Sequence, residues 1–230
     1  MKHVVVLTGA GISADSGLQT FRGLNGLWNG YRIEEVASPE GWHKDPKQVL
    51  DFYNMRRQEI KSSKPNEGHL ALAKLEKKFK VSIITQNIDD LHERAGSSEV
   101  LHLHGEIVYA RSELDPDLTV HIGYQDLAIG QLAPDGTQLR PNIVWFGEPV
   151  PKLQGAANLV SKADIFIVAG TSLQVYPAAG LVDYAPAISQ NYVVDIDIPE
   201  KVLRDNFQPI SMSAAEGLPK LVKTLLLQTT

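Results

Sequence analysis

The chain has 230 residues, of which 43% are hydrophobic and 21% are charged, and its formal net charge is −5. This length suits one main domain with a small inserted one, and the net negative charge gives no indication of a nucleic-acid-binding surface. No cationic region precedes an apolar stretch, as in a signal peptide, and no apolar run reaches the roughly 18 residues of a membrane span, so we expect a cytoplasmic protein with no membrane partner. The absence of cysteine excludes disulfides, thiolate catalysis and cysteine-based zinc sites.

The chain opens with a predicted buried strand that leads directly into glycines. Val4–Thr8 is apolar throughout, as is typical of a parallel strand covered on both faces. Gly9 and Gly11 follow with the spacing Gly-x-Gly-x-x-Ala of the dinucleotide fingerprint, which would let a diphosphate approach the backbone, and Ser13 would cap the next helix. On its own, the turn is equally consistent with a tight connection between a strand and a helix.

A long excursion, residues 18–80, separates this strand from the next. No strand ending in an acidic residue follows about 20 residues after the glycines, as a dehydrogenase would require. Instead, the loop with Phe21 and Arg22 could fold over a bound nucleotide, or it could be a surface loop with one packed Phe. Helices are expected over Pro46–Ser62 and from a cap at Asn66 to Lys78.

Polar side chains follow the second predicted strand, Val81–Thr85. Asn87 and Asp89 come just beyond its carboxyl end, where side chains of a doubly wound sheet project into the ligand crevice. Asn both donates and accepts whereas ionised Asp only accepts, so the two side chains together complement a carboxamide. A turn at Asn87 with a helix cap at Asp89 would explain the same residues.

Two histidines come next, in the segment Leu101-His102-Leu103-His104-Gly105. We expect only one of them to face a given pocket. His104, beside the glycine, is the better candidate for a general base because imidazole titrates near neutrality, while a structural hydrogen-bonding role is the alternative. His102, His104 and His121 lack the spacing of metal ligands, so we expect no metal site.

The rest of the chain predicts a small lobe and a return to the main sheet. Turn-forming residues interrupt 105–140, and Pro141–Pro149 is expected to rejoin the main sheet. Strands are expected at Ile165–Ala169 and Tyr192–Asp195, and a closing helix at Leu218–Leu227. After the third strand, Gly170-Thr171-Ser172 would bind the other end of a dinucleotide or form a plain capped turn.

These elements together predict an α/β fold, with a Rossmann-like, doubly wound and mostly parallel sheet and a small inserted lobe. The Rossmann-like part would comprise residues 1–30, 80–104 and 141–230, with a helical excursion at 31–79 and the lobe at 105–140.

Several of these motifs occur in the order found in sirtuins. They are Gly9-Ala10-Gly11-Ile12-Ser13 with Phe21-Arg22, Thr85-Gln86-Asn87-Ile88-Asp89, His104-Gly105, Val144-Trp145-Phe146-Gly147-Glu148 and Gly170-Thr171-Ser172. On these residues the chain resembles the sirtuins, which are NAD-dependent protein-lysine deacylases, over residues 3–220. The resemblance implies one domain, 1–230, in which NAD is consumed as the acyl group moves from lysine to ADP-ribose.

The resemblance also implies roles for individual residues. His104 would deprotonate a ribose hydroxyl, with Asn87 as the second catalytic residue, and Asn87 and Asp89 would hold the nicotinamide carboxamide. Val144, Phe146 and Gly147 would bind the acyl-lysine peptide, which adds as a strand. The expected NAD contacts are Gly9, Ala10, Gly11, Ile12, Ala14, Phe21, Arg22, Gln86, Asn87, Ile88, Asp89, His104, Gly170, Thr171, Ser172, Asp197 and Ala214.

Tyr53 and Arg56 carry an indication of acyl preference. They lie three residues apart in an expected helix and so share a face, where a phenol and a guanidinium can bind one carboxylate. In sirtuins that prefer acidic acyl groups such as succinyl and malonyl, a Tyr-x-x-Arg pair has this role beside a small alanine, which Ala37 matches. Simple packing of both side chains on the helix surface is the alternative.

Two features depart from the sirtuin pattern. Most sirtuins hold the small lobe with four cysteines around zinc; here we expect no zinc, and a lobe stabilised by packing of Ile107, Tyr109, Leu114, Leu118, Ile122, Tyr124 and Leu127. Asp197 stands where the family usually has Asn, so it can accept from a ribose but not donate.

We expect a monomer that acts on acyl-lysine proteins. An NAD hydrolase or ADP-ribosyltransferase, and a non-catalytic NAD or ADP-ribose sensor, are the alternative functions.

Overall fold

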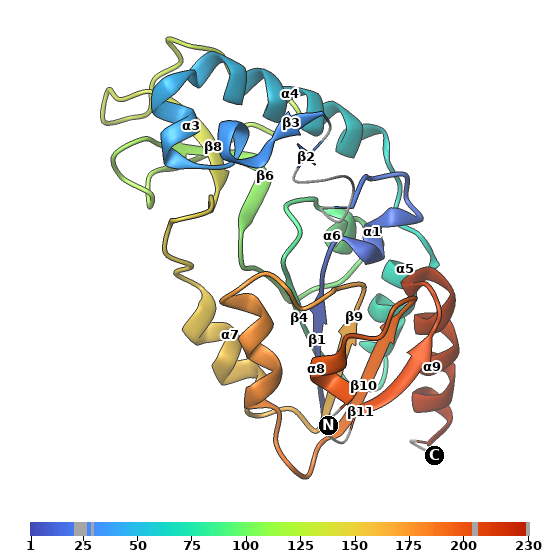
Figure 1. Ribbon diagram of the computed structural model, residues 1–230. Coiled ribbons are helices and arrows are strands. Elements are labelled where there is room, and N and C mark those ends of the chain that lie inside the picture. The colour runs from blue at the N-terminus through green and yellow to red at the C-terminus, as the bar shows by residue number, and fades with distance from the viewer. Residues whose placement is uncertain (21–26, 29, 204–206, 229–230) are drawn as a thin grey trace.

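A sheet of parallel strands forms the centre of the larger part of the molecule (Figure 1). The computed structural model describes residues 1–20, 27–28, 30–203 and 207–228, so Phe21 and Arg22 lie outside the described residues. Within these ranges the strand order of this sheet is β11-β10-β9-β1-β4-β5. The strands are β1 (His3–Thr8), β4 (Lys80–Thr85), β5 (Val100–His102), β9 (Ile165–Ala169), β10 (Gln190–Asp195) and β11 (Phe207–Ser211).

Alternation along β1 divides the core into two layers. Val4 and Val6 belong to one buried cluster, and Val5 and Leu7 to another on the opposite face, because successive side chains of a strand point to opposite faces. Helices α5 (Glu67–Leu75) and α9 (Ala214–Gln228) cover the first face. Helix α7 (Leu153–Val160) and the 3₁₀ helix η1 (Ala178–Tyr184) cover the second. The continuous apolar run thus reflects burial on both faces.

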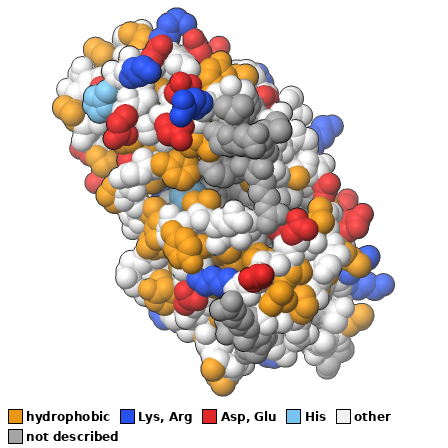
Figure 2. Space-filling view, in the orientation of Figure 1, with side chains coloured by type: hydrophobic (Ala, Val, Ile, Leu, Met, Phe, Trp, Pro, Cys, Tyr) orange, Lys and Arg blue, Asp and Glu red, His pale blue; other side chains and the backbone are white. Residues whose placement is uncertain are grey.

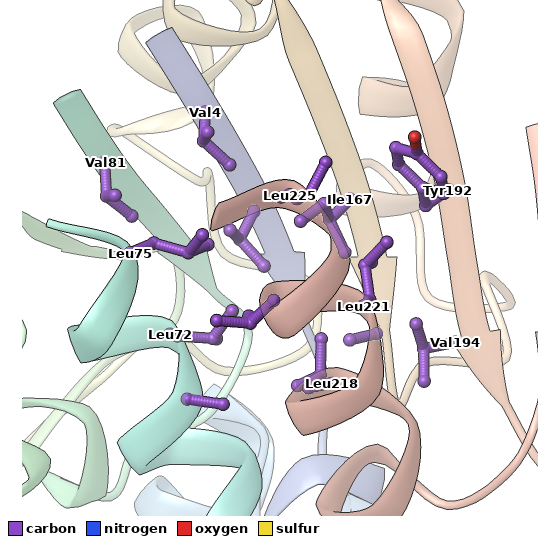
Figure 3. Packing of buried hydrophobic residues seen from close by; sticks show 14 of the residues in the cluster. Val4, Leu72, Leu75, Val81, Ile167, Tyr192, Val194, Leu218, Leu221 and Leu225 are labelled. Carbon is purple, nitrogen blue, oxygen red and sulfur yellow. The ribbon is translucent and has the colours of Figure 1, made fainter. Parts of the chain in front are cut away.

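Figure 3 shows the first of these layers from close by. Leu72 and Leu75 of α5 and Leu218 and Leu221 of α9 point toward the strands. These helices are held against each other as well as against the sheet, since leucines of both belong to the same buried cluster. Burial of such side chains contributes about 1.5–3 kcal/mol each, which makes this layer a principal source of stability for the sheet.

The order of the strands creates a switch point between β1 and β9. From β1 the chain proceeds outward to β4 and β5, and the later strands β9, β10 and β11 extend on the other side of β1. All five pairings in this sheet are parallel. The predicted doubly wound α/β class is therefore confirmed, and the switch point is where such sheets bind ligands.

The excursion between β1 and β4 is mainly helical. Its elements are α1 (Gly11–Ala14), β2 (Leu27–Trp28), β3 (Tyr31–Arg32), α2 (Ile33–Val36), α3 (Pro39–Lys44), α4 (Pro46–Ser62) and α5. Helix α4 has the predicted bounds, because Asp45 caps it by accepting from the Gln48 N–H and Pro46 occupies its first turn. Asn66 caps α5 as predicted, but this helix ends at Leu75 rather than Lys78. Two short helices, α6 (Leu91–Ala95) and α8 (Glu200–Leu203), follow other strands.

The small lobe contains a sheet of its own, with strand order β7-β6-β8. Its strands are β6 (Gly105–Ser112), β7 (Thr119–His121) and β8 (Leu139–Ile143). The expectation that Pro141 returns the chain to the main sheet is wrong, because β8 pairs antiparallel with β6 and places Pro141 opposite Ala110. A proline is tolerated there because β8 is an edge strand of this sheet.

The lobe packs against α4 through a third buried cluster. Ile107, Ala110 and Leu139 belong to it together with Phe52 and Tyr53 of α4. Of the residues expected to stabilise the lobe, Ile107 and Leu127 are buried and Ile122 and Tyr124 are packed against this cluster. The expectation that Leu114 stabilises the lobe by packing is wrong, since this residue is 78% exposed.

Polar contacts also link the turns of the lobe, so the expectation of packing alone is incomplete. The Ser112 hydroxyl donates to Asp135 Oδ2 over 2.6 Å and lies 2.9 Å from Thr137 Oγ1. The buried guanidinium of Arg57 donates from Nε to the Ile107 carbonyl over 3.0 Å and from Nη1 to Asn54 over 2.7 Å. The Ser112 contacts join the end of β6 to the turn at Asp135, and the Arg57 contacts hold the lobe against α4, without any cysteine.

Among the described residues, no helix is both long and apolar enough to cross a membrane.

Candidate active site

A cleft of about 840 Å³ runs along the carboxyl edge of the main sheet, below the lobe and α4. Figure 2 shows the molecule hollowed between these two parts, with apolar side chains bordering the hollow. The predicted residues that line the cleft are Gly9, Ala10, Gly11, Ala14, Ala37, Tyr53, Arg56, Gln86, Asn87, Ile88, Asp89, His104, Val144, Phe146, Gly147, Gly170, Thr171, Ser172, Asp197 and Ala214. Ile12 does not line it, because its side chain is buried in the core beneath the first turn. One continuous cavity therefore brings together residues from both parts of the molecule.

The first and third turns of the sheet form one rim of the cleft, backbone against backbone. The Gly11 N–H donates to the Gly170 carbonyl over 2.8 Å. Gly170 has a φ of +62°, and a Cβ on it would lie 2.3 Å from the nitrogen of Ile12. Glycine is thus required at position 170 by the contact between the two turns. Gln86 joins the rim by donating to Thr171 Oγ1 over 3.0 Å.

Ser13 is not the cap of α1. The N-cap position is Ala10, without a side-chain hydrogen bond, and Ser13 is the third residue of this helix. Its hydroxyl instead donates to Asp89 Oδ2 over 3.1 Å and lies 3.2 Å from Asn87 Nδ2, which also donates to the Gly9 carbonyl. Ser13 therefore connects the first turn to the two side chains that follow β4, a role that its position after the glycines does not indicate.

Asn87 and Asp89 are both buried at the floor of the cleft. Because the Asn87 amide nitrogen is engaged by Gly9 and Ser13, its side-chain oxygen is the polar atom left for a ligand. Asp89 accepts from the Leu91 N–H as well as from Ser13, and burial raises the pKa of its carboxyl. Asp89 is not the N-cap of α6, which is Asp90, but its carboxylate accepts from the N–H of the first residue of this helix and also lines the cleft.

The two histidines have different environments, and only His104 lines the cleft. Its Nδ1 donates to the Gln86 carbonyl over 3.0 Å, so Nε2 carries the lone pair, and burial lowers the pKa of the imidazole. His102 is buried away from the cleft between the Asn87 carbonyl and Glu93 Oε1, at 3.0 and 2.8 Å. Burial lowers the pKa of His102, but Glu93 outweighs this and raises it. Burial thus favours the neutral form of His104, whereas His102 forms an ion pair with Glu93 when it is protonated.

The end of the cleft under α4 is aromatic, and among the described residues Arg56 provides a buried cation there. The Tyr53 hydroxyl accepts from Trp145 Nε1 over 3.0 Å, and burial raises the pKa of this phenol. The Arg56 side chain is 4% exposed, its guanidinium lies 5.3 Å from the centre of the Trp28 ring, and burial lowers its pKa. Its Nε has no hydrogen-bond partner among the described residues, and its Nη1 forms an ion pair with Glu59. This end can therefore surround an aliphatic chain and bind a carboxylate at its tip.

A loop after β8 forms the opposite wall. The Val144 N–H donates to the His104 carbonyl over 2.9 Å, and the Phe146 N–H to the Ala37 carbonyl over 3.0 Å. Glu148 holds the loop by accepting from the Trp145 N–H and from Arg140, over 2.8 Å each. Burial opposes the charge on Glu148, but Arg140 keeps its pKa lowered. The loop is thereby fixed next to His104 and Ala37.

Several lining residues were not predicted as site residues. They are Ser13, Asp15, Leu18, Gln19, Thr20, Trp28, Ile33, Ile60, Ile143, Trp145, Glu148, Val150, Gln174, Val175, Tyr176, Pro177, Asp195, Ile196 and Ser213. The apolar members carry no local signal, because a pattern that predicts burial cannot distinguish the wall of a cleft from the core. Ser13, Trp145 and Glu148 lay inside motifs that already pointed to the site.

A nucleotide fits the sheet edge of this cleft. Backbone turns that exclude a Cβ, the Asn87 oxygen and the imidazole of His104 follow one another along it, with Asp197 and Ala214 at the far end. Within the described residues, no group of three or more His, Asp or Glu could hold a metal ion. The fold and the cleft thus define a nucleotide-binding α/β protein with an inserted lobe.

Comparison with known proteins specifies the family. Residues 9–177 match the Sir2 family, and the chain belongs to it. It is 54% identical over 226 residues to an NAD-dependent protein deacylase of Helicobacter pylori (strain ATCC 700392 / 26695), covering 98% of both chains. It is 48% identical to an NAD-dependent protein deacylase of Bacteroides thetaiotaomicron, covering 98% of this chain and 99% of the relative.

Solved structures agree with this assignment. A Sir2 homologue in complex with NAD superposes with a TM-score of 0.88 at 38% identity, covering 100% of this chain and 91% of that one. A complex of Sir2 with a p53 peptide and NAD superposes with a TM-score of 0.75 at 29% identity, covering 98% of this chain and 92% of that one.

Proposed function

We propose that this protein removes acyl groups, and acidic ones above all, from protein lysines, with NAD as the co-substrate. NAD-dependent protein deacylation is supported by membership of the Sir2 family and by relatives that carry this name over nearly their whole length. The acidic preference is supported by one observation on this chain, a buried arginine and a phenol at the end of the cleft.

NAD would lie along the sheet edge. Bound there, it supplies a ribose carbon that carries a positively charged nicotinamide leaving group, which the acyl-lysine amide oxygen displaces. The side-chain oxygen of Asn87 is available to the amide hydrogens of the nicotinamide. Asp89 and Ser13 fix the orientation of Asn87 through the hydrogen bonds among them. Orientation of this kind matters because an amide oxygen is a weak nucleophile that reacts only when it is held in line with the leaving group.

His104 would act as the general base. Because Nδ1 donates to the Gln86 carbonyl, Nε2 is the atom that accepts the proton of a ribose hydroxyl. The lowered pKa keeps the imidazole neutral, and so able to act, near pH 7. The proton leaves the hydroxyl as that oxygen attacks the acyl carbon, and the bond from this carbon to the lysine nitrogen breaks, so that the lysine leaves as an amine that has taken up a proton. A water molecule then adds to the same carbon, the bond from this carbon to the former amide oxygen breaks, and the acyl group ends on the ribose hydroxyl of ADP-ribose.

The acyl group would extend under α4. Tyr53 accepts from Trp145, so its own proton can be donated to an acyl carboxylate, and the guanidinium of Arg56 supplies the charge. Ala37, which lines the same end, leaves room for the longer chain. Each charge-assisted hydrogen bond in a buried site changes the preference for an acidic over a neutral acyl group about 10- to 150-fold. Because the guanidinium supplies the charge, Arg56 is the residue that decides this preference.

Turnover of defined peptides tests the proposal. The protein is incubated with NAD and an acetyl-, succinyl- or malonyl-lysine peptide, and nicotinamide and deacylated peptide are both measured. We expect R56M to lower desuccinylation at least about tenfold more than deacetylation. The matched control is R32M, which removes an exposed arginine on the surface and should leave the ratio unchanged. Equal losses in both reactions with R56M would refute the acidic preference.

The same assay separates the alternative functions. Release of nicotinamide without peptide would favour an NAD hydrolase, and no release with any peptide would favour a non-catalytic sensor.

A further inference from the structure

We propose that Glu59 sets how strongly the acyl pocket favours acidic over neutral acyl groups, by holding the guanidinium of Arg56 from the side away from the cleft. This inference depends on the proposed function, because it assigns a regulator of specificity to the same pocket. Glu59 is a positioning residue, since it does not line the cleft that would hold the reacting atoms.

The two partners of this ion pair line different cavities. Arg56 lines the large cleft together with Tyr53 and Ala37. Glu59 instead lines a second, more open hollow whose other walls are Ser16, Gly17, Gln19, Ser62 and Ser63, of which Gln19 also lines the cleft. An acyl carboxylate would therefore reach Arg56 from the cleft, while Glu59 contacts it from the hollow. The two carboxylates can bind the same guanidinium without occupying the same place.

The burial of the two partners is unequal. The Arg56 side chain is 4% exposed, whereas Glu59 is 40% exposed and forms its ion pair with Arg56 through Nη1. A cation buried to this degree is costly without a counter-charge, so Glu59 compensates Arg56 whenever the acyl group carries no charge. The unbonded Nε leaves a further donor on the same guanidinium.

The charge around Arg56 explains the effect on specificity. Asp89 also lies near enough to act on Arg56 electrostatically, and Tyr53 is neutral. With Glu59 present, a neutral acyl group meets a cation that is already paired, whereas an acidic acyl group adds a second negative charge beside Glu59. Without Glu59, the acidic group would supply the missing counter-charge and the neutral group would not. Glu59 thus widens the range of acyl groups that the pocket accepts, and its loss would favour acidic acyl groups.

The test compares E59Q with a matched variant of the same helix. E59Q removes the charge and keeps the shape, and D51N removes one charge from the exposed ion pair of Lys47 with Asp51 on α4. We expect E59Q to raise the ratio of desuccinylation to deacetylation, in kcat/KM, about three- to tenfold, mainly through KM for the peptides. D51N should leave the ratio unchanged.

Measuring R56M beside E59Q separates a failure of this inference from a failure of the proposed acidic preference. If R56M abolishes the preference and E59Q leaves the ratio unchanged or lowers it, the inference is overturned while the proposed function stands. If R56M itself leaves the ratio unchanged, the proposed acidic preference fails. Should E59Q be too unstable to assay, E59D shortens the side chain by one methylene and so moves the carboxylate away from Arg56. E59D should shift the ratio in the same direction, and an unshifted ratio for E59D overturns the inference.

Discussion

The contact between the two glycine turns predicts a large loss of stability for a single methyl group. Replacing Gly170 by Ala would place a Cβ 2.3 Å from the Ile12 nitrogen and 2.7 Å from the Gly11 carbonyl carbon, on a residue whose φ is +62°. The left-handed conformation costs an L residue about 1–2 kcal/mol, and overpacking of this kind about 1–3 kcal/mol. We therefore expect G170A to lower the free energy of unfolding by about 2–5 kcal/mol.

Urea denaturation at pH 7.5 measures this loss, and the KM for NAD measures its consequence for the site, since Gly170 and Gly11 share one rim. For a chain of this length, the loss corresponds to about 4–20 °C in Tm. The matched control is G180A in η1, where a Cβ meets nothing within 4 Å; it should be neutral or stabilising by up to about 1 kcal/mol. If G170A proved as stable as G180A with an unchanged KM, the reasoning about the packed turns would be refuted.

Three further predictions concern titration and metals. Since burial lowers the pKa of His104, kcat/KM should fall only as pH drops below about 6.5. H104N should lose about 10²- to 10⁴-fold in activity, and its remaining activity should no longer fall over this acidic range. A fall in the kcat/KM of the unmodified protein centred above pH 7 would contradict the assignment of His104 as the base. Burial lowers the pKa of His69 to about 4, so in the window from pH 6.5 to 4 the unfolded chain binds a proton that the folded protein excludes, and stability should decline with falling pH by up to about 3 kcal/mol. H69Q keeps an acceptor for the Asn66 N–H and should reduce this decline in urea titrations; an unchanged decline would assign it to other groups. EDTA should leave Tm and activity unchanged, because the chain has no cysteine, whereas a loss reversed by zinc would show that metal holds the lobe.

Local patterns were sufficient for elements whose limits depend on their own residues. The four expected strands are all present, each within two residues of its predicted start. Helix α4 has the predicted limits, and its start is fixed by Asp45 as the cap and Pro46 in the first turn. Strand β11 was not predicted, since Phe207–Ser211 is mostly exposed and so lacks the buried apolar run of a central strand.

The sequence by itself also determined most of the candidate site, because the glycine turns, Asn87, Asp89 and His104 follow strands that must end at one edge of a parallel sheet. Tyr53 and Arg56 share a helix face for an equally local reason. Only the tertiary structure decided that Ser13 bonds Asp89, that β8 belongs to the lobe and that Trp145 bonds Tyr53. The physical reason is that periodicity and capping act over a few residues, whereas these contacts join segments about 76 to 92 residues apart, or depend on which sheet a strand enters.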